Sequence, residues 1–285
     1  MLSRFLDLIL AELFLLTRRT ATWVLMATWT LLGLMFAYIV PYVMYRNGDD
    51  EGPGTIPSML PDQLTATLLD GYPFFGGAIA LVLGVLAVGS EFGWDTFKTL
   101  FTQRPGRGQI FAAKMIALGI VIVPFVVVQF AAGAATGVVI GLLEDVAISA
   151  PSATSVIQGI MAGWMVLAAW AAVGVLLAVA TRGTSLAIGI GILYSLVIEG
   201  LVSALAGSIG VVEPIVDFFL RANAYSLVRP LGGASSITGD SAATDGPGAF
   251  SGPFVDETQA ALVLVAYMVV LLGASVWMLR RRDVD

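Results

Sequence analysis

The sequence predicts an all-α polytopic membrane protein that crosses the bilayer six times. Its 285 residues are 58% hydrophobic and 12% charged, and that charged fraction is about half the usual value for a soluble domain. The apolar residues form long runs, most of them close to the ~20 residues that a helical span requires. The charged residues collect between those runs and are sorted by sign. We therefore expect a single transmembrane domain over residues 1–285.

An amphipathic helix is expected before the first span, over residues 1–19. Arg4, Asp7 and Glu12 recur there at helical spacing, and leucine, isoleucine and phenylalanine fill most of the positions between them. This pattern is typical of a helix that lies in the membrane interface in contact with lipids. A helix that packs on the bundle as a simple anchor is the alternative interpretation.

Six apolar stretches are the expected spans, and a long loop separates the last two. The second span is short and rich in glycine, and the third is long enough to tilt. The loop over residues 207–259 begins with an apolar part that predicts short outer helices before the sixth span. It continues with the glycine, serine and aspartate composition of a flexible external loop. In chain order the spans are residues 21–45, 74–90, 115–143, 156–180, 184–206 and 260–279.

The basic residues predict which side of the membrane each loop occupies. Most of the 14 lysines and arginines flank the spans on the side that carries both termini, whereas most of the 20 acidic residues fall on the other side. An excess of lysine and arginine marks the cytoplasmic side of a membrane protein. Both termini and the loop between the second and third spans are therefore expected to be cytoplasmic.

That loop, "SEFGWDTFKTLFTQRPGRGQIFAAK" over residues 90–114, mixes charges with aromatic residues. Residues 94–101 have helical potential, and Pro105 and the glycines around it end the helix. An ordinary cytoplasmic loop would account for the charges but not for the cluster of aromatic residues, and an exposed apolar surface usually contacts a partner. The side chains expected to face water or lipid phosphate are Lys98, Arg104, Arg107 and Lys114.

At this loop the sequence resembles the permease subunit of ABC-2 type ABC transporters. The family pattern is an acidic residue after the second span, a Gly-Thr pair, an apolar helix, a proline, an Arg-Gly pair and a later lysine. Asp95 stands where the family often has glycine, and the proline and the arginine are closer together than usual. The positions that match are Glu91, Thr96, Phe97–Phe101, Pro105, Arg107–Gly108 and Lys114.

The resemblance covers nearly the whole chain and implies a mechanism. Within a cytoplasmic coupling segment over residues 93–108, residues 93–104 would form a coupling helix that sits in a groove of a separate ABC ATPase subunit. The interfacial helix would touch the same subunit. Two permease copies, as a homodimer, and two ATPases would form an exporter in the plasma membrane of a prokaryote. The residues that would contact the ATPase are Glu91, Trp94, Asp95, Thr96, Phe97, Lys98, Arg104 and Arg107.

The residue types present argue against catalysis by the chain itself. The sequence has no histidine and no cysteine, so it offers neither the usual zinc ligands nor a histidine base. The only lysines, Lys98 and Lys114, follow Phe97 and Ala113, whereas a Walker A loop needs glycine before its lysine. We expect no metal or cofactor in this chain and no nucleic-acid partner. ATP and magnesium would belong to the partner subunit.

Two polar residues inside the expected spans are candidates for a substrate path. Glu199 lies in the fifth span, where an acid costs ~2.5–3.5 kcal/mol on insertion scales. It could contact a polar or cationic substrate, or it could lie near the outer end or pair with a neighbouring helix. Gln129 in the third span is a milder case that also suits bonding between helices. The apolar spans favour a hydrophobic or amphipathic cargo: a lipid, a drug-like compound or an antimicrobial peptide.

A gradient-driven secondary transporter or channel that uses Glu199 is the alternative function. It would need a relay of ionisable residues within the membrane, and Glu199 is the sole candidate in the sequence. An intramembrane enzyme is a third class, which would need histidine or clustered acids that the spans lack.

Overall fold

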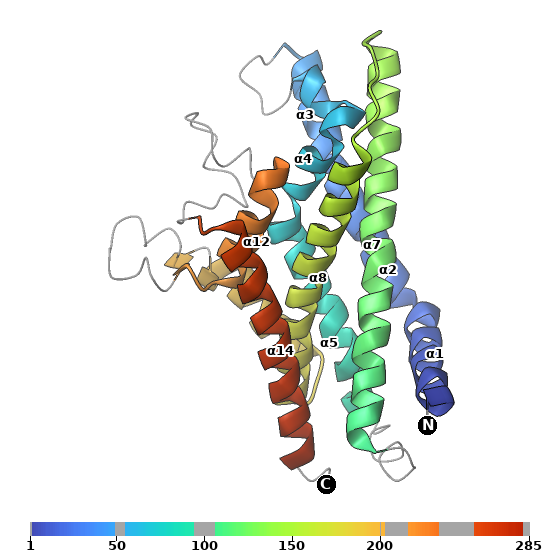
Figure 1. The fold of residues 1–285 in the computed structure, drawn as a ribbon, viewed down its shortest axis with the longest axis vertical. Coiled ribbons are helices and arrows are strands. Elements are labelled where there is room, and N and C mark those ends of the chain that lie inside the picture. The colour runs from blue at the N-terminus through green and yellow to red at the C-terminus, as the bar shows by residue number, and fades with distance from the viewer. Residues whose placement is uncertain are drawn as a thin grey trace.

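A computed structural model describes residues 2–48, 55–93, 106–199, 201–202, 216–233 and 254–281. Within these ranges every regular element is a helix, as Figure 1 shows. Residues 94–105, which form most of the expected coupling segment, lie outside the described ranges, as do residues 207–215 and 234–253 of the expected outer loop.

Five helices of the described chain are long and apolar enough to cross a membrane, so the protein is a multi-pass membrane protein. They are Thr20–Arg46, Tyr72–Glu91, Gly108–Leu143, Ala153–Thr181 and Glu257–Arg281. Each overlaps one of the expected spans; four have ends within three residues of those expected, and the third begins seven residues earlier. Where the span over residues 184–206 is expected, there is a shorter apolar helix, Ser185–Ile198. The six-span arrangement therefore stays a prediction.

The first two spans each contain a π-helical turn. The first span is a continuous run in which a π-helical turn joins two α-helices, and the second begins with a π-helical turn. The elements are α1 (Leu2–Arg18), α2 (Thr20–Leu34), η1 (Met35–Ile39), α3 (Val40–Arg46), η2 (Ile56–Met59), η3 (Pro61–Gln63), α4 (Leu64–Leu69), η4 (Tyr72–Gly76), α5 (Gly77–Gly93), α7 (Arg107–Leu143), α8 (Ala153–Thr181), α9 (Ser185–Ile192), η5 (Leu193–Ile198), α12 (Leu220–Val228), η6 (Arg229–Leu231) and α14 (Glu257–Arg281).

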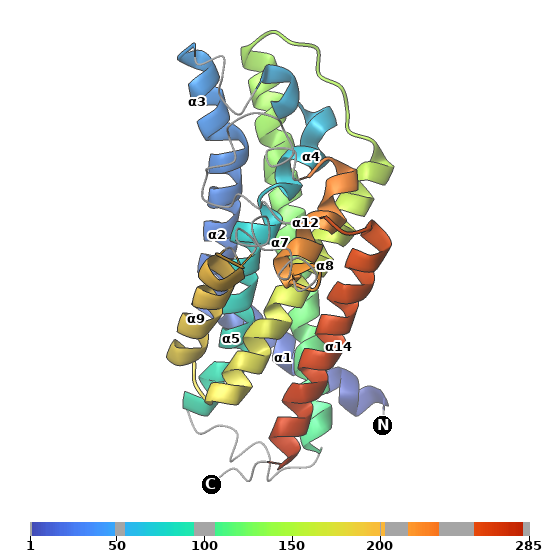
Figure 2. The ribbon, with the colours of Figure 1, turned by 90° about the vertical axis from the view of Figure 1, so that its left-hand side faces the viewer.

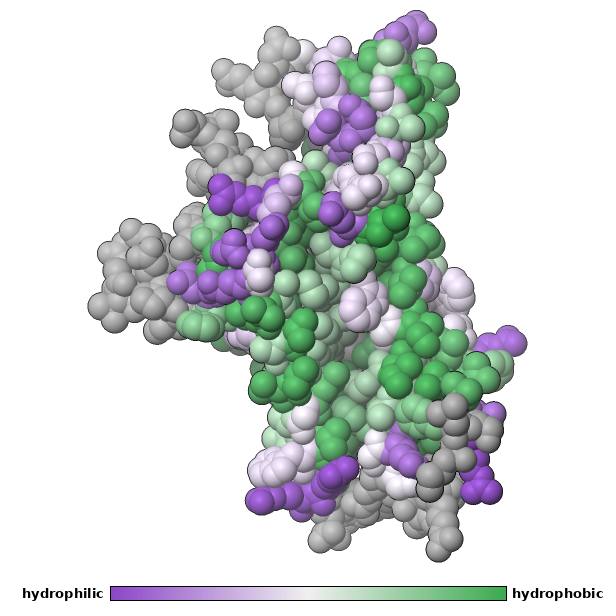
Figure 3. Space-filling model, viewed as in Figure 1, coloured by the Kyte–Doolittle hydropathy of each residue, from purple (hydrophilic) through white to green (hydrophobic). Residues whose placement is uncertain are grey.

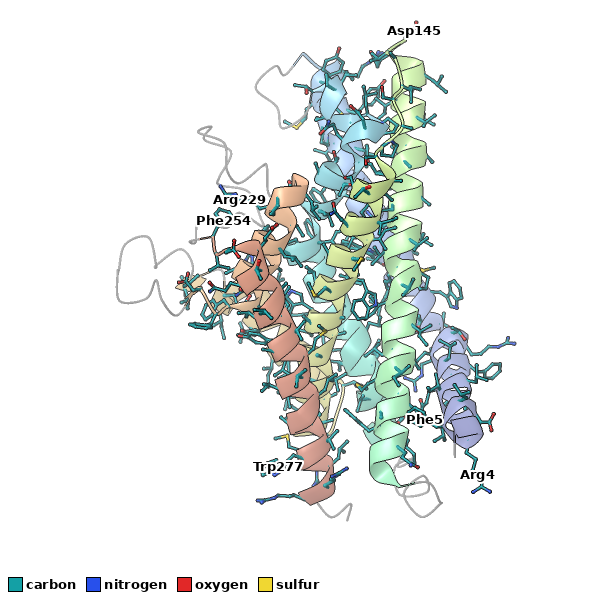
Figure 4. All side chains as sticks on the ribbon, in the orientation of Figure 1. Arg4, Phe5, Asp145, Arg229, Phe254 and Trp277 are labelled. Atoms are coloured by element: carbon teal, nitrogen blue, oxygen red, sulfur yellow. The ribbon has the colours of Figure 1, made fainter. Side chains whose placement is uncertain are left out.

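The two ends of the bundle differ in what they carry. Both chain ends lie at the same end in Figure 1. Arg4 and Trp277 are at that end, and Asp145, which follows α7, is at the opposite one (Figure 4). The helix α1 is inclined across the foot of the bundle in Figure 2. This arrangement agrees with the expectation that both termini share one side of the membrane.

The core lies where α5 crosses α8. Glycines at the crossing let the two backbones touch: a Cβ added at Gly84 would lie 2.1 Å from the carbonyl oxygen of Ala171, and one at Gly174 would lie 2.1 Å from that of Leu81. By contrast, only 11% of the apolar window of Thr20–Arg46 and 17% of that of Glu257–Arg281 are buried. Figure 3 shows the apolar surface over α7 and α14, which suits contact with lipid.

The α5–α8 crossing gives a first testable prediction. Replacing Gly84 by alanine should push the two backbones apart and lower the free energy of unfolding by about 1–3 kcal/mol or more, as overpacking does. Thermal unfolding of the detergent-solubilised protein, followed by tryptophan fluorescence, measures the change. The control is Gly273→Ala in α14, where an added Cβ meets nothing within 4 Å and where alanine favours the helix. Equal stability of the two variants would contradict this account of the core.

Candidate functional site

A buried ion cluster lies at the end of the bundle that carries both termini. The side chain of Lys114 in α7 is 2% exposed, and its Nζ donates a hydrogen bond of 2.6 Å to Oε2 of Glu12 in α1. The same ammonium donates to Oε1 of Glu91 near the end of α5. One lysine therefore joins three helices, and two of them border the stretch over residues 94–105.

The position of Lys114 corrects the expectation that it faces water or lipid phosphate. The helix α1 covers this side of α7, so the ammonium meets Glu12 and Glu91 instead of solvent. A buried ammonium requires such partners, because an isolated charge in a medium of low polarity is very costly. Arg107, the first residue of α7, starts the helix two turns earlier.

The orientation of α1 follows from the same contact. Glu12 is turned toward the bundle, and Leu6, Leu10 and Phe14 are among the residues that α1 exposes. An amphipathic helix is thus present as expected, with an outward face that is largely apolar. Such a face suits the boundary between headgroups and acyl chains, while the inner face carries the carboxylate that binds Lys114.

A second basic residue ties the first span to the second. The Nη1 of Arg19, between α1 and α2, donates to the carbonyl oxygen of Leu86 at 2.6 Å and to Oγ of Ser90 at 2.7 Å. Because Ser90 precedes Glu91, Arg19 brings a second positive charge close to the two carboxylates of the cluster. The last turns of α5 are therefore held by Arg19 on one side and by Lys114 on the other.

Of the expected ATPase contacts, the structure describes the side chain of Glu91 alone. The side chain of Glu91 is buried, and its Oε2 makes no hydrogen bond within the described part of the chain. Glu91 therefore belongs to the ion cluster of this chain, in contact with Lys114. The side chain of Arg107 is not described, and Trp94, Asp95, Thr96, Phe97, Lys98 and Arg104 lie outside the described residues. Their contact with an ATPase stays a prediction.

Glu199 binds the start of a neighbouring helix. It is 0% exposed, and its Oε1 and Oε2 accept hydrogen bonds of 3.1 Å from the backbone N–H groups of Leu220 and Arg221. These are the first two residues of α12, whose N–H groups have no partner within the helix. The positive end of the helix dipole also favours a carboxylate there. This geometry matches the interpretation in which Glu199 pairs with a neighbouring helix.

Arg221 was not singled out by the sequence reasoning, yet it is one of the buried charges. Its guanidinium lies 5.0 Å from the ring centroid of Phe74 and 5.7 Å from that of Tyr225, which are distances typical of cation–π contacts. The residue is 2% exposed. An arginine in an apolar loop segment was the available signal, because such a residue needs partners if the segment packs on the spans.

Gln129 lies between two helices. A Cβ added at Gly33 in α2 would be 1.7 Å from Nε2 of Gln129 in α7, so the amide occupies space that only glycine leaves open. The side chain is fully buried. Gln129 therefore contributes to the packing of α2 on α7, and nothing in the described chain places it on a path for substrate. Among the described residues there is also no group of three or more potential metal ligands.

These features define a class of protein: a multi-pass helical membrane protein with an ion cluster that joins its second and third spans. The sequence model described as "ABC-2 family transporter protein" matches residues 8–198. The chain belongs to this family. The matched range contains Glu12, Glu91 and Lys114, and it ends before α12 and α14. A comparison with curated proteins finds no match.

The contact between Glu199 and α12 gives a second prediction. Replacing Glu199 by alanine leaves two buried N–H groups without an acceptor, which should lower the free energy of unfolding by about 1–3 kcal/mol. Hydrogen exchange at the first turn of α12 should become faster. Thermal unfolding and exchange mass spectrometry measure both effects. Glu257→Ala, at the exposed start of α14, is the matched control, and equal losses in the two variants would refute a capping role.

Proposed function

We propose that this chain is the permease subunit of an ATP-driven exporter and that a separate cytoplasmic ATPase subunit drives it. The observation that carries the proposal is the ion cluster in a member of the ABC-2 family. The stretch over residues 94–105 follows α5, whose last turn carries Glu91, and precedes α7, whose third turn carries Lys114. Those two residues are bonded to each other. A force applied to the stretch therefore acts on both helices together.

The path from the cluster into the membrane supports the same function. The helix α5 runs from Glu91 to its crossing with α8, where Gly84 and Gly174 bring the backbones into contact. Closely packed elements transmit displacement with little loss, because protein interiors are dense and stiff. Movement of the stretch would thus reach the core of the permease. The absence of a Walker A lysine in the sequence agrees with an energy source in another chain.

The orientation and the cargo follow from charge and composition. Arg18, Arg19, Arg280 and Arg281 lie at the end of the bundle that carries both termini, which makes that end cytoplasmic by the positive-inside rule. The apolar surface of the spans suits a hydrophobic or amphipathic cargo, such as a lipid, a drug-like compound or an antimicrobial peptide. Two permease copies and two ATPase subunits would form the complete transporter in a prokaryotic plasma membrane.

Co-purification from the native membrane tests this function. The tagged chain is solubilised gently, bound proteins are identified by mass spectrometry, and ATP hydrolysis is measured with and without vanadate. An ATPase subunit in equal amount, with vanadate-sensitive hydrolysis, is the expected result. A chain that elutes alone from several detergents at good yield would reject the proposal and favour the gradient-driven alternative that uses Glu199.

Variants of the stretch give a third prediction. The double variant Trp94→Ala/Phe97→Ala and the variant Arg104→Glu should each reduce the amount of ATPase that co-purifies by about tenfold or more, because aromatic and arginine residues dominate binding energy at interfaces. Membrane insertion should not change. Arg46→Glu, at the opposite end of the bundle, reverses an exposed charge and is the control. Unchanged ATPase binding in the Trp94/Phe97 and Arg104 variants would mean that the stretch is an ordinary cytoplasmic loop.

A further inference from the structure

The ion cluster is more elaborate than anchoring α1 requires. A buried ion pair contributes little to stability, because the cost of removing the charges from water offsets their attraction. Apolar side chains at Glu12 and Lys114 would hold α1 on α7 equally well. What buried charges add is a single permitted arrangement, since any displacement leaves a charge unpaired in a medium of low polarity.

Lys114 donates hydrogen bonds to two carboxylates that lie on different helices. Glu91 belongs to the same helical hairpin as Lys114, on the other side of the stretch over residues 94–105, whereas Glu12 belongs to α1. One bond therefore fixes the two ends of the stretch relative to each other, and the other fixes α1 to both. The outward face of α1, with Leu6, Leu10 and Phe14 exposed, suits insertion into the lipid interface.

We propose that Lys114 is a positioning residue for energy coupling: through Glu12 and Glu91 it makes α1 and both ends of the stretch over residues 94–105 one mechanical unit. This inference rests on the proposed function. A displacement imposed by the ATPase would move α1, the end of α5 and the start of α7 together. The interfacial helix α1 then moves together with α7, and the bond between its Glu12 and Lys114 sets its register on α7.

The opposite end of the bundle supplies a matched control. There Glu144, which follows α7, accepts a hydrogen bond of 2.7 Å from the hydroxyl of Tyr42 and contacts Arg46 at 3.3 Å. That ion pair also joins the first span to α7, but the side chain of Arg46 is 63% exposed. Water and salt weaken an exposed pair, so its loss should leave the movement of α1 unchanged.

The test measures the distance between α1 and α7 in the complete transporter. Because the natural chain has no cysteine, spin labels can be placed only at Leu10→Cys and Ile120→Cys, both of which are exposed. Double electron–electron resonance is recorded on the complex with its ATPase, without nucleotide and after trapping with ATP and vanadate. In the otherwise unchanged chain and in Arg46→Gln, we expect the same narrow distance peak in both states.

The decisive variant removes all three charges at once. Glu12→Gln/Glu91→Gln/Lys114→Met leaves no buried charge unpaired, so the protein should still fold. Its α1–α7 distance should match the natural chain without nucleotide and should shift or broaden after trapping. The exchange Glu12→Lys/Glu91→Lys/Lys114→Glu reverses the sign of every charge, so both pairs remain opposite in charge, and it should restore the single peak.

Each result has one meaning. A triple variant whose distance stays fixed after trapping would overturn the inference and leave the cluster a purely structural contact. A distance that shifts equally in the natural chain would overturn it as well, and so would an exchange variant that behaves like the triple variant. If the natural chain yields no ATPase that vanadate can trap, the proposed function itself fails, which distinguishes the two outcomes.

Discussion

The interior of a bilayer contains no water, so each polar group that the chain carries into it has to be satisfied by the protein. Lys114 depends on two carboxylates from different helices, and Glu199 depends on the backbone of α12. Arg221 lies against the faces of two aromatic rings. Apart from the contact of Arg221 with Tyr225 in the same helix, these contacts join different elements of the fold. A few polar residues therefore restrict how the helices can be placed, within a bundle whose core is apolar.

The two ends of the bundle satisfy their polar groups in different ways. At the end with the termini, lysine and arginine side chains bind the last turns of α5, which lead into the stretch over residues 94–105. At the other end, an exposed pair joins the first span to α7. Buried ionic contacts hold the first end in one arrangement, whereas water can reach part of the second.

Hydropathy alone was sufficient for most of the fold, because a run of about 20 apolar residues has few other structures open to it. Five expected spans overlap long apolar helices on this basis, and only the third has an end that differs by as much as seven residues. The sixth, over residues 184–206, is described only in part, so its crossing stays a prediction. An amphipathic helix before the first span was predicted, and it is present. Of the polar residues behind that prediction, Arg4 and Asp7 are exposed, whereas Glu12 lies on the buried face.

The environment of individual charges was harder to predict. Periodicity indicates which residues share a face of α1, but it cannot indicate whether that face meets water or another helix. Lys114 was assigned to solvent for this reason, since nothing local in the sequence shows that α1 lies against α7. Arg221 was missed because Phe74, one of its two aromatic partners, lies far away in the sequence, in η4. Tertiary contacts of this kind become visible only when the helices are placed together.

The crossing of α5 and α8 has a mechanical consequence. At Gly84 and Gly174 no side chain separates the two backbones, so neither helix can slide along the other without a clash of main-chain atoms. Side-chain rotamers, which usually absorb small shifts between packed helices, are missing at this point. The two helices can therefore rotate relative to each other about their point of contact. A displacement at the foot of α5 would then become an opposite displacement at its far end, so the crossing would reverse the direction of the movement.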